Sequence, residues 1–172
     1  MQSAYGVGPG LATVVAPADG IGAAPRLRLD GRVRTPLELG LHELRALPQH
    51  TVLRRALSCA GRSLDPAVGL RRWRGVRLTA LLELAGLRLE RQRERGAIQV
   101  LAHGRDGYVA SFSWSELFNG PAGEDVLVAL SADGVAFAAG DAPRLIAAHD
   151  WQSSARQVRG LCRIEVLAPQ TD

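Results

Sequence analysis

The chain has 172 residues, of which 47% are hydrophobic and only 5% aromatic, and these values predict one globular domain with an aliphatic core. The formal net charge is +4 and all 21 basic residues are arginine, but no aromatic residues alternate with them. This pattern argues against a base-stacking nucleic-acid platform and leaves small anionic ligands open. No run approaches the roughly 18 apolar residues of a membrane helix, so we expect a cytoplasmic protein without a membrane span.

The first part of the chain divides into an arm and the start of a domain. Residues 1–25 are rich in Gly, Ala and Pro without a sustained period, so we expect a loose arm, with the domain covering residues 26–172. The stretch "RLRLDGRV" predicts a hairpin around Asp30-Gly31, and "LGLHELRALP" predicts one short helix. "TVLRRALS" is typical of a strand that ends at Cys59.

The remaining segments alternate between short helices and strands. "RRWRGVRLTALLELAG" predicts an aromatic lead-in to an amphipathic helix, with Thr79 as N-cap and Gly86 as terminator. Strands are expected at "AIQVLA", "YVASF", "RLIAA" and "CRIEVLA", a short helix after the capping-box residue Ser113, and a hairpin around Asp133-Gly134. The sequence therefore predicts a mixed, strand-rich α+β fold.

The two cysteines are not placed as a disulfide framework or a zinc site, because they are far apart in sequence and lack clustered histidines. Cys59 stands at a strand end before Ala60-Gly61, where a glycine turn lets a ligand approach a thiolate closely. The other interpretation is a buried structural cysteine, which Cys162 fits better. No Ser-His-Asp order, phosphate-binding glycine loop or paired carboxylates stand out.

The order of several motifs carries a family resemblance. The chain contains "SCAG", then "RRWRGVRLTALLELAGL", "DGY", "GDAPRLI" and finally "ARQVRGLCRIEVL". Together these resemble the molybdopterin-binding oxidoreductase domain of the sulfite oxidase family, from about Arg26 to Leu167. The resemblance implies the strand-rich α+β fold of those enzymes and a molybdenum cofactor.

The resemblance also implies roles for individual residues. Cys59 would give its thiolate to molybdenum, and the cofactor-binding residues would be Cys59, Ala60, Gly61, Arg62, Arg144, Arg156 and Arg159. Arg159 would lie nearest the cofactor phosphate. Asp106 and Tyr108 in the "DGY" turn would border the catalytic site, although a plain turn aspartate beside a core tyrosine explains the pattern equally well.

The family reaction implied is oxygen-atom transfer between molybdenum and a sulfur-centred substrate such as sulfite or a sulfoxide. The sequence has no haem motif, dinucleotide-binding glycine loop or cysteine set for an iron–sulfur cluster, so an external electron-transfer partner is expected.

Some family features are missing. The family commonly has an upstream Arg-Asn-His motif, "CAGN" and a His-Gly pair, whereas this chain has an arm lacking Arg and His, then Arg62, and then Ala139-Gly140. These departures keep open a second class of protein: a cofactor-free or weakly binding module of the same fold that binds a protein partner or a small anion.

Overall fold

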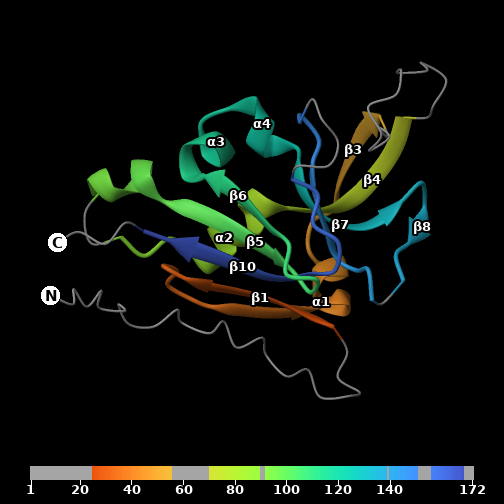
Figure 1. Ribbon diagram of the computed structural model, residues 1–172, viewed down its shortest axis with the longest axis horizontal. Helices are drawn as coiled ribbons and strands as arrows, with labels where there is room; N and C mark the ends of the chain where they lie inside the picture. The colour runs from red at the N-terminus through yellow and green to blue at the C-terminus, as the bar shows by residue number, and fades with distance from the viewer. Residues whose placement is uncertain (1–24, 56–69, 90–91, 139, 151–155, 169–172) are drawn as a thin grey trace, which may run out of the picture.

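The computed structural model describes residues 25–55, 70–89, 92–138, 140–150 and 156–168. Its strands form two sheets, with short helices beside them, as Figure 1 shows. The strand-rich α+β fold expected from the sequence is confirmed. No helix in these ranges is long and apolar enough to span a membrane.

The first sheet has the order β2-β1-β10-β5-β6. β1 pairs in parallel with β10, and the other neighbours are antiparallel. The bounds are β1 Arg26–Gly31, β2 Leu37–Gly40, β5 Gln99–Gly104, β6 Val109–Ser113 and β10 Leu161–Leu167.

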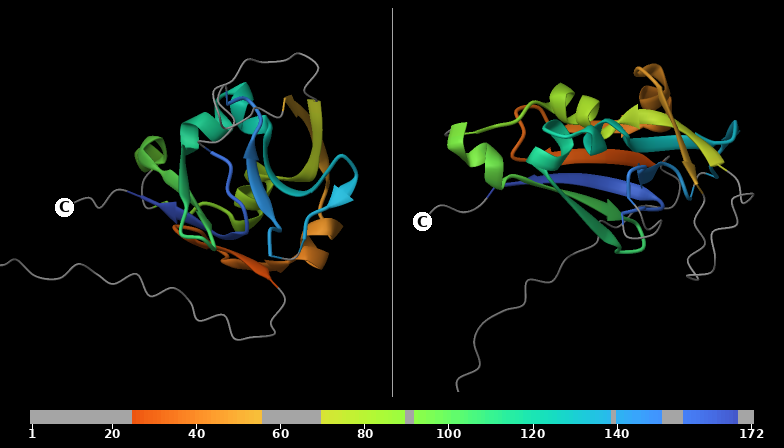
Figure 2. Two further views of the ribbon diagram at one scale, coloured as in Figure 1. Left: turned by 45° about the vertical axis from the view of Figure 1, so that its right-hand side comes forward. Right: turned by 90° about the horizontal axis from the view of Figure 1, so that it is seen from above.

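The second sheet has the order β3-β4-β7-β8, and β9 also pairs with β7. All of its pairings are antiparallel. The bounds are β3 His50–Arg55, β4 Leu70–Arg77, β7 Val126–Ala132, β8 Val135–Ala136 and β9 Arg144–Ala147. The two views of Figure 2 show the strong curvature of this sheet.

The helices are short and pack beside the sheets. They are α1 Leu41–Ala46, α2 Leu78–Ala85, α3 Trp114–Phe118 and α4 Pro121–Glu124, with a 3-10 helix, η1, at Gln92–Ala97. Figure 1 shows α3 and α4 together at the top of the molecule. The buried side of α2 consists of Leu78, Leu81, Leu82 and Ala85, whereas Leu84, which we also expected in the core, is 53% exposed.

Two apolar cores meet at β7, where residues 126–130 are all buried. Val126, Val128 and Leu130 belong to the main core, which includes the first sheet and α2. Alternate residues of β7 enter a smaller group on the opposite face, the second core: Val52, Trp73, Leu127, Ala129, Ala132 and Ile146. β7 is therefore covered on both faces over most of its length.

Several predicted elements are confirmed. The Asp133-Gly134 turn joins β7 to β8 as a two-residue hairpin, and both residues have positive φ, 52° and 81°. Ser113 caps α3 by accepting a 3.0 Å hydrogen bond from the Glu116 amide. Gly86 ends α2 with φ 66°.

Three expectations are wrong. Asp30-Gly31 is not a hairpin turn, because β1 continues through both residues, which pair in parallel with β10, and the connection to β2 comes later. The N-cap of α2 is Arg77, without a side-chain cap, rather than Thr79. The aromatic lead-in is strand β4, since pairing with β3 and β7 on its two sides overrides its irregular local pattern.

Gly75 in β4 allows β7 to approach closely. A Cβ added there would lie 2.1 Å from the carbonyl oxygen of Val128 and 2.6 Å from the Cα of Ala129, which are backbone atoms. We predict that Gly75→Ala lowers the free energy of unfolding by about 2 kcal/mol or more, measured by urea denaturation. Gly96→Ala is the control, because nothing lies within 4 Å of its added Cβ, and it should change stability by less than about 0.5 kcal/mol. Equal effects of the two substitutions would contradict this packing.

Candidate functional site

Arg54 is a buried arginine on the same face of β3 as Val52, at the border of the second core, and only 5% of it is exposed. Its Nη1 donates to the carbonyl oxygen of Ala147 at 2.8 Å, and its Nη2 donates to the carbonyl oxygen of Asp150 at 3.1 Å. Burial lowers the pKa of the guanidinium, and the charge of Asp150 acts in the opposite direction. Arg54 thus joins β3 to the chain that leaves β9.

Arg156 is held by two carboxylates. Its Nε donates to both carboxylate oxygens of Asp150, at 3.1 and 3.0 Å, its Nη2 pairs with Asp150 as well, and its Nη1 pairs with Glu116 of α3. The guanidinium also lies over the Phe112 ring, 4.8 Å from the ring centroid. The hydrogen bonds to Asp150 are the largest cause of a raised pKa for Arg156, with burial opposing them.

Arg144 at the start of β9 lies beside the second core. Its Nη2 donates to Asp141 at 2.8 Å, and its guanidinium carbon is 4.3 Å from the centroid of the Phe137 ring. The Nε of Arg144 is buried and has no hydrogen-bond partner among the residues that the structure describes. A buried cationic donor without an acceptor favours an anionic or oxygen-bearing ligand at this position.

Trp73 contributes a second donor next to the same aromatic ring. Its ring centroid is 5.9 Å from that of Phe137, and its indole N–H is buried and finds no hydrogen-bond partner in the described part of the chain. Phe137 therefore contacts both of the side chains that carry these donors, Trp73 and Arg144. The sequence singled out Arg144 but not Phe137 or the indole of Trp73, because neither local pattern shows which side chain borders a core.

The turn between β5 and β6 lies against the chain that precedes β9 and β10. Arg105 donates through its amide to the Gly160 carbonyl at 3.0 Å and through Nη1 to the Gly140 carbonyl at 3.1 Å. Asp106 accepts from the Tyr108 amide at 3.0 Å, as a plain turn aspartate does. Tyr108 is exposed, so the alternative of a core tyrosine is wrong.

The three arginines predicted to bind the cofactor lie on neighbouring backbone segments, but their side chains contact different residues. Leu145 and Val158 form a bridge with hydrogen bonds of 2.8 and 3.1 Å, which places Arg144 beside the segment that carries Arg156 and Arg159. Arg144 pairs with Asp141, Arg156 pairs with Asp150 and Glu116, and Arg159 is exposed. That all three reach one ligand stays a prediction.

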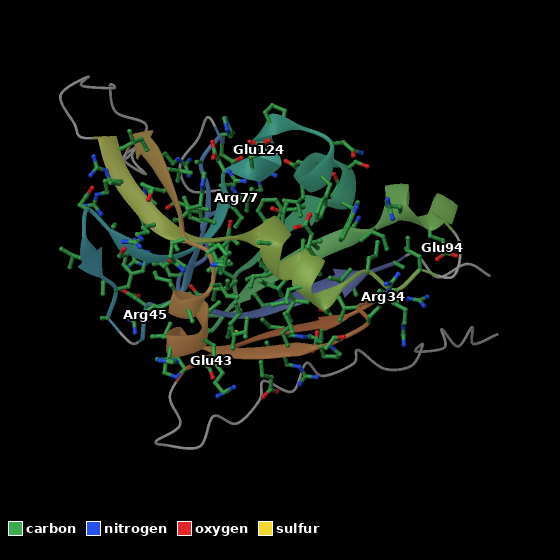
Figure 3. All side chains as sticks on the ribbon, turned by 180° about the vertical axis from the view of Figure 1, so that it is seen from behind. Arg34, Glu43, Arg45, Arg77, Glu94 and Glu124 are labelled. Carbon is green, nitrogen blue, oxygen red and sulfur yellow. The ribbon has the colours of Figure 1, made fainter. Side chains whose placement is uncertain are left out.

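A cluster of ionisable side chains that the sequence did not indicate connects β3 and β4 with the residues that follow α4 and β9. Asp125 contacts His50 at 3.3 Å and His149 at 2.8 Å, and Arg77 Nη2 is 3.3 Å from His50 Nε2. Figure 3 labels Arg77 and, on the neighbouring α4, Glu124. Within the described ranges no group of three or more His, Cys, Asp or Glu is arranged to hold a metal ion.

Several predicted site residues lie outside the described ranges. These are Cys59, Ala60, Gly61 and Arg62, together with Ala139 and most of the predicted arm, residues 1–24. The other cysteine, Cys162, is half-buried, and its Sγ donates to the His103 carbonyl oxygen at 3.3 Å. Cys162 thus has a local hydrogen-bonding role within the first sheet.

Comparison with known families places the chain in one of them. The family profile described as "Oxidoreductase molybdopterin binding domain" matches residues 18–172, so the chain belongs to this family, and the resemblance found in the sequence is confirmed. No curated protein matches the chain.

A solved structure has a similar fold. It is described as the crystal structure of the sulfane dehydrogenase SoxCD from Paracoccus pantotrophus, with a TM-score of 0.60 and 20% sequence identity. The similarity covers 86% of this chain and 39% of that one, so this chain spans well under half of the similar protein.

The charge network around Arg156 can be tested by a double-mutant cycle. We predict that Arg156→Met and Glu116→Gln are coupled by about 1 kcal/mol in the free energy of unfolding, because each removes the ion pair between these two half-buried side chains. The exposed pair Arg26 and Glu43, 3.9 Å apart, is the control and should show no measurable coupling. Additive effects of Arg156→Met and Glu116→Gln would contradict this role.

Proposed function

We propose that this protein is a molybdenum-cofactor-dependent oxidoreductase that transfers an oxygen atom to or from a sulfur-centred substrate of the sulfite or sulfoxide type. The observation that carries the proposal is Arg144 beside the second core, whose buried Nε has no acceptor within the described ranges, in a chain that belongs to the molybdopterin-binding family. A guanidinium suits the phosphate and oxygen-rich edge of such a cofactor.

The residues fit this cofactor in two respects. Cys59 follows β3 in the sequence and would supply the soft thiolate ligand that molybdenum favours. Arg144 would donate to the bound group, while Arg54 would hold the end of β3 against the chain that leaves β9. When bound, the cofactor supplies a metal that changes its oxidation state by two electrons.

The electrons of each turnover need another carrier in this proposal. The sequence has no haem-attachment motif, dinucleotide-binding loop or cysteine set for an iron–sulfur cluster. A separate electron-transfer partner would therefore accept or supply them. The cytoplasmic location expected from the sequence stays a prediction.

A second function is favoured by the state of Arg156. Both of its guanidinium edges and its face are engaged by Asp150, Glu116 and Phe112, so Arg156 binds a phosphate only if these contacts change. Together with Ala139 and Arg62 in place of the family residues, this supports the alternative of a cofactor-free or weakly binding module.

Metal content separates the two functions. We predict close to one molybdenum per chain when the protein is made in a host that synthesises the cofactor, and loss of the metal in Cys59→Ser because the thiolate ligand is removed. Elemental analysis measures the ratio. Cys162→Ser is the matched control and should keep its metal, since a hydroxyl can replace the thiol as donor to His103. A metal-free wild type from such a host would favour the binding module.

Substrate class and electron supply can be measured together. We predict that the molybdenum-loaded protein oxidises sulfite or reduces sulfoxides only when an artificial dye is present as electron acceptor or donor. Steady-state rates with and without dye test this directly. Turnover without dye would contradict the external partner, and inactivity towards every substrate despite full metal loading would contradict the oxidoreductase.

A further inference from the structure

The register of the second sheet places six side chains on one face. Thr51, Arg74, Ser131 and Ala136 are aligned across β3, β4, β7 and β8, and Leu53 is paired with Arg72 in the next such row. Paired residues of antiparallel strands point to the same side of a sheet. We call this surface the basic face: Thr51, Leu53, Arg72, Arg74, Ser131 and Ala136.

The basic face continues a buried face of the sheet, and most of its residues are exposed. Val76 of β4 lies in the main core, and Arg74 and Arg72 follow on the same side of the strand because side chains alternate. Both arginines are exposed, whereas Trp73 between them is buried in the second core. At this end of β4, the described part of the chain thus buries the side chains on one side of the sheet and leaves those on the other side exposed.

The chemistry of the basic face is apolar and cationic. Leu53 is 59% exposed, and it lies opposite Arg72 on the neighbouring strand. The face itself contains no acidic residue. The carboxylate of Asp133, in the adjacent turn, is already engaged by Arg71 and the Arg72 amide.

We propose that the basic face docks an acidic protein, and that this protein is the electron-transfer partner. The second statement rests on the proposed function. Two guanidiniums around an exposed leucine match the arginine-rich, partly apolar composition of docking sites, and the surplus of positive charge selects an acidic partner. A second copy of this chain would bring like charges together at the same face.

The location is suited to electron transfer in the proposed enzyme. Leu53 is in β3, and Cys59 follows it by six positions in the sequence. Arg54, the next residue after Leu53, points to the opposite face and borders the second core. β3 therefore carries Leu53 of the basic face and, directly after it, Arg54, which borders the second core beside the candidate cofactor site.

The test uses succinylated cytochrome c as an acidic redox protein and unmodified, basic cytochrome c as its counterpart. We expect the full chain, without metal or loaded with molybdenum, to bind the succinylated form at low ionic strength and to release it as salt is added. Arg72→Glu with Arg74→Glu should weaken binding at least tenfold by calorimetric titration. The milder pair Arg72→Gln and Arg74→Gln and the single change Leu53→Ser should each weaken it at least threefold.

Arg34→Glu with Arg95→Glu is the matched control, because both arginines are exposed. Figure 3 shows Arg34 near Glu94, away from β4. This pair should leave binding within twofold of wild type. An equal loss in the control, no binding of the succinylated protein, or tighter binding of basic cytochrome c, duplex DNA or phosphatidylglycerol vesicles would overturn the proposal.

The electron-transfer part has its own readout. In the loaded protein, Arg72→Gln with Arg74→Gln should keep turnover with a small uncharged dye and lose at least threefold in kcat/KM for succinylated cytochrome c. Unchanged kcat/KM would overturn the partner's redox role. Because binding is measured without metal as well, absence of molybdenum would refute the proposed function and leave the docking result standing.

Discussion

The buried guanidinium of Arg54 connects parts of the second sheet that backbone hydrogen bonds do not. In the described part of the chain β3 pairs with β4 and β9 pairs with β7, and no ladder joins β3 to β9. Arg54 spans this gap by donating to the carbonyls of Ala147 and Asp150. A buried charge is costly unless it is hydrogen-bonded, and these two carbonyls offset part of the cost of burying Arg54.

The contacts beyond Arg54 continue along one chain of charges. Asp150 accepts from Arg156 through its carboxylate while its carbonyl accepts from Arg54, and Arg156 reaches Glu116 in α3. These contacts therefore connect three parts of the chain: β3, which precedes Cys59 in the sequence, the end of β9, and α3. The family match and the buried donor of Arg144 support the proposal that this region binds the cofactor.

Much of the fold could be predicted from local patterns. The alternation of β5 and β6, the leucine spacing of α2 and the Asp133-Gly134 turn all depend on neighbours in sequence, and the structure confirms them. β4 could not be predicted in this way, because "RRWRGVR" becomes a strand only through pairing with β3 and β7. The hairpin predicted at Asp30-Gly31 was wrong for the same reason, because β10, the strand with which these residues pair in parallel, is distant in sequence.

The candidate site could be predicted only in part. Arg144 and Arg156 were found through the family motifs, but the carboxylates that hold Arg156 come from Asp150 and Glu116, which no local pattern connects. Arg54 was one of many arginines in the sequence. Its burial depends on carbonyls more than ninety positions away, at Ala147 and Asp150.

The central claim is that this chain holds a molybdenum cofactor through the cysteine that follows β3. X-ray absorption at the molybdenum edge of the loaded protein tests it most directly, because it counts the sulfur ligands of the metal. The account predicts a third sulfur, in addition to the two of the cofactor dithiolene, that is absent from any metal-loaded fraction of Cys59→Ser and present in Cys162→Ser. A wild-type protein with only two sulfur ligands, or a third sulfur that persists without Cys59, would contradict it.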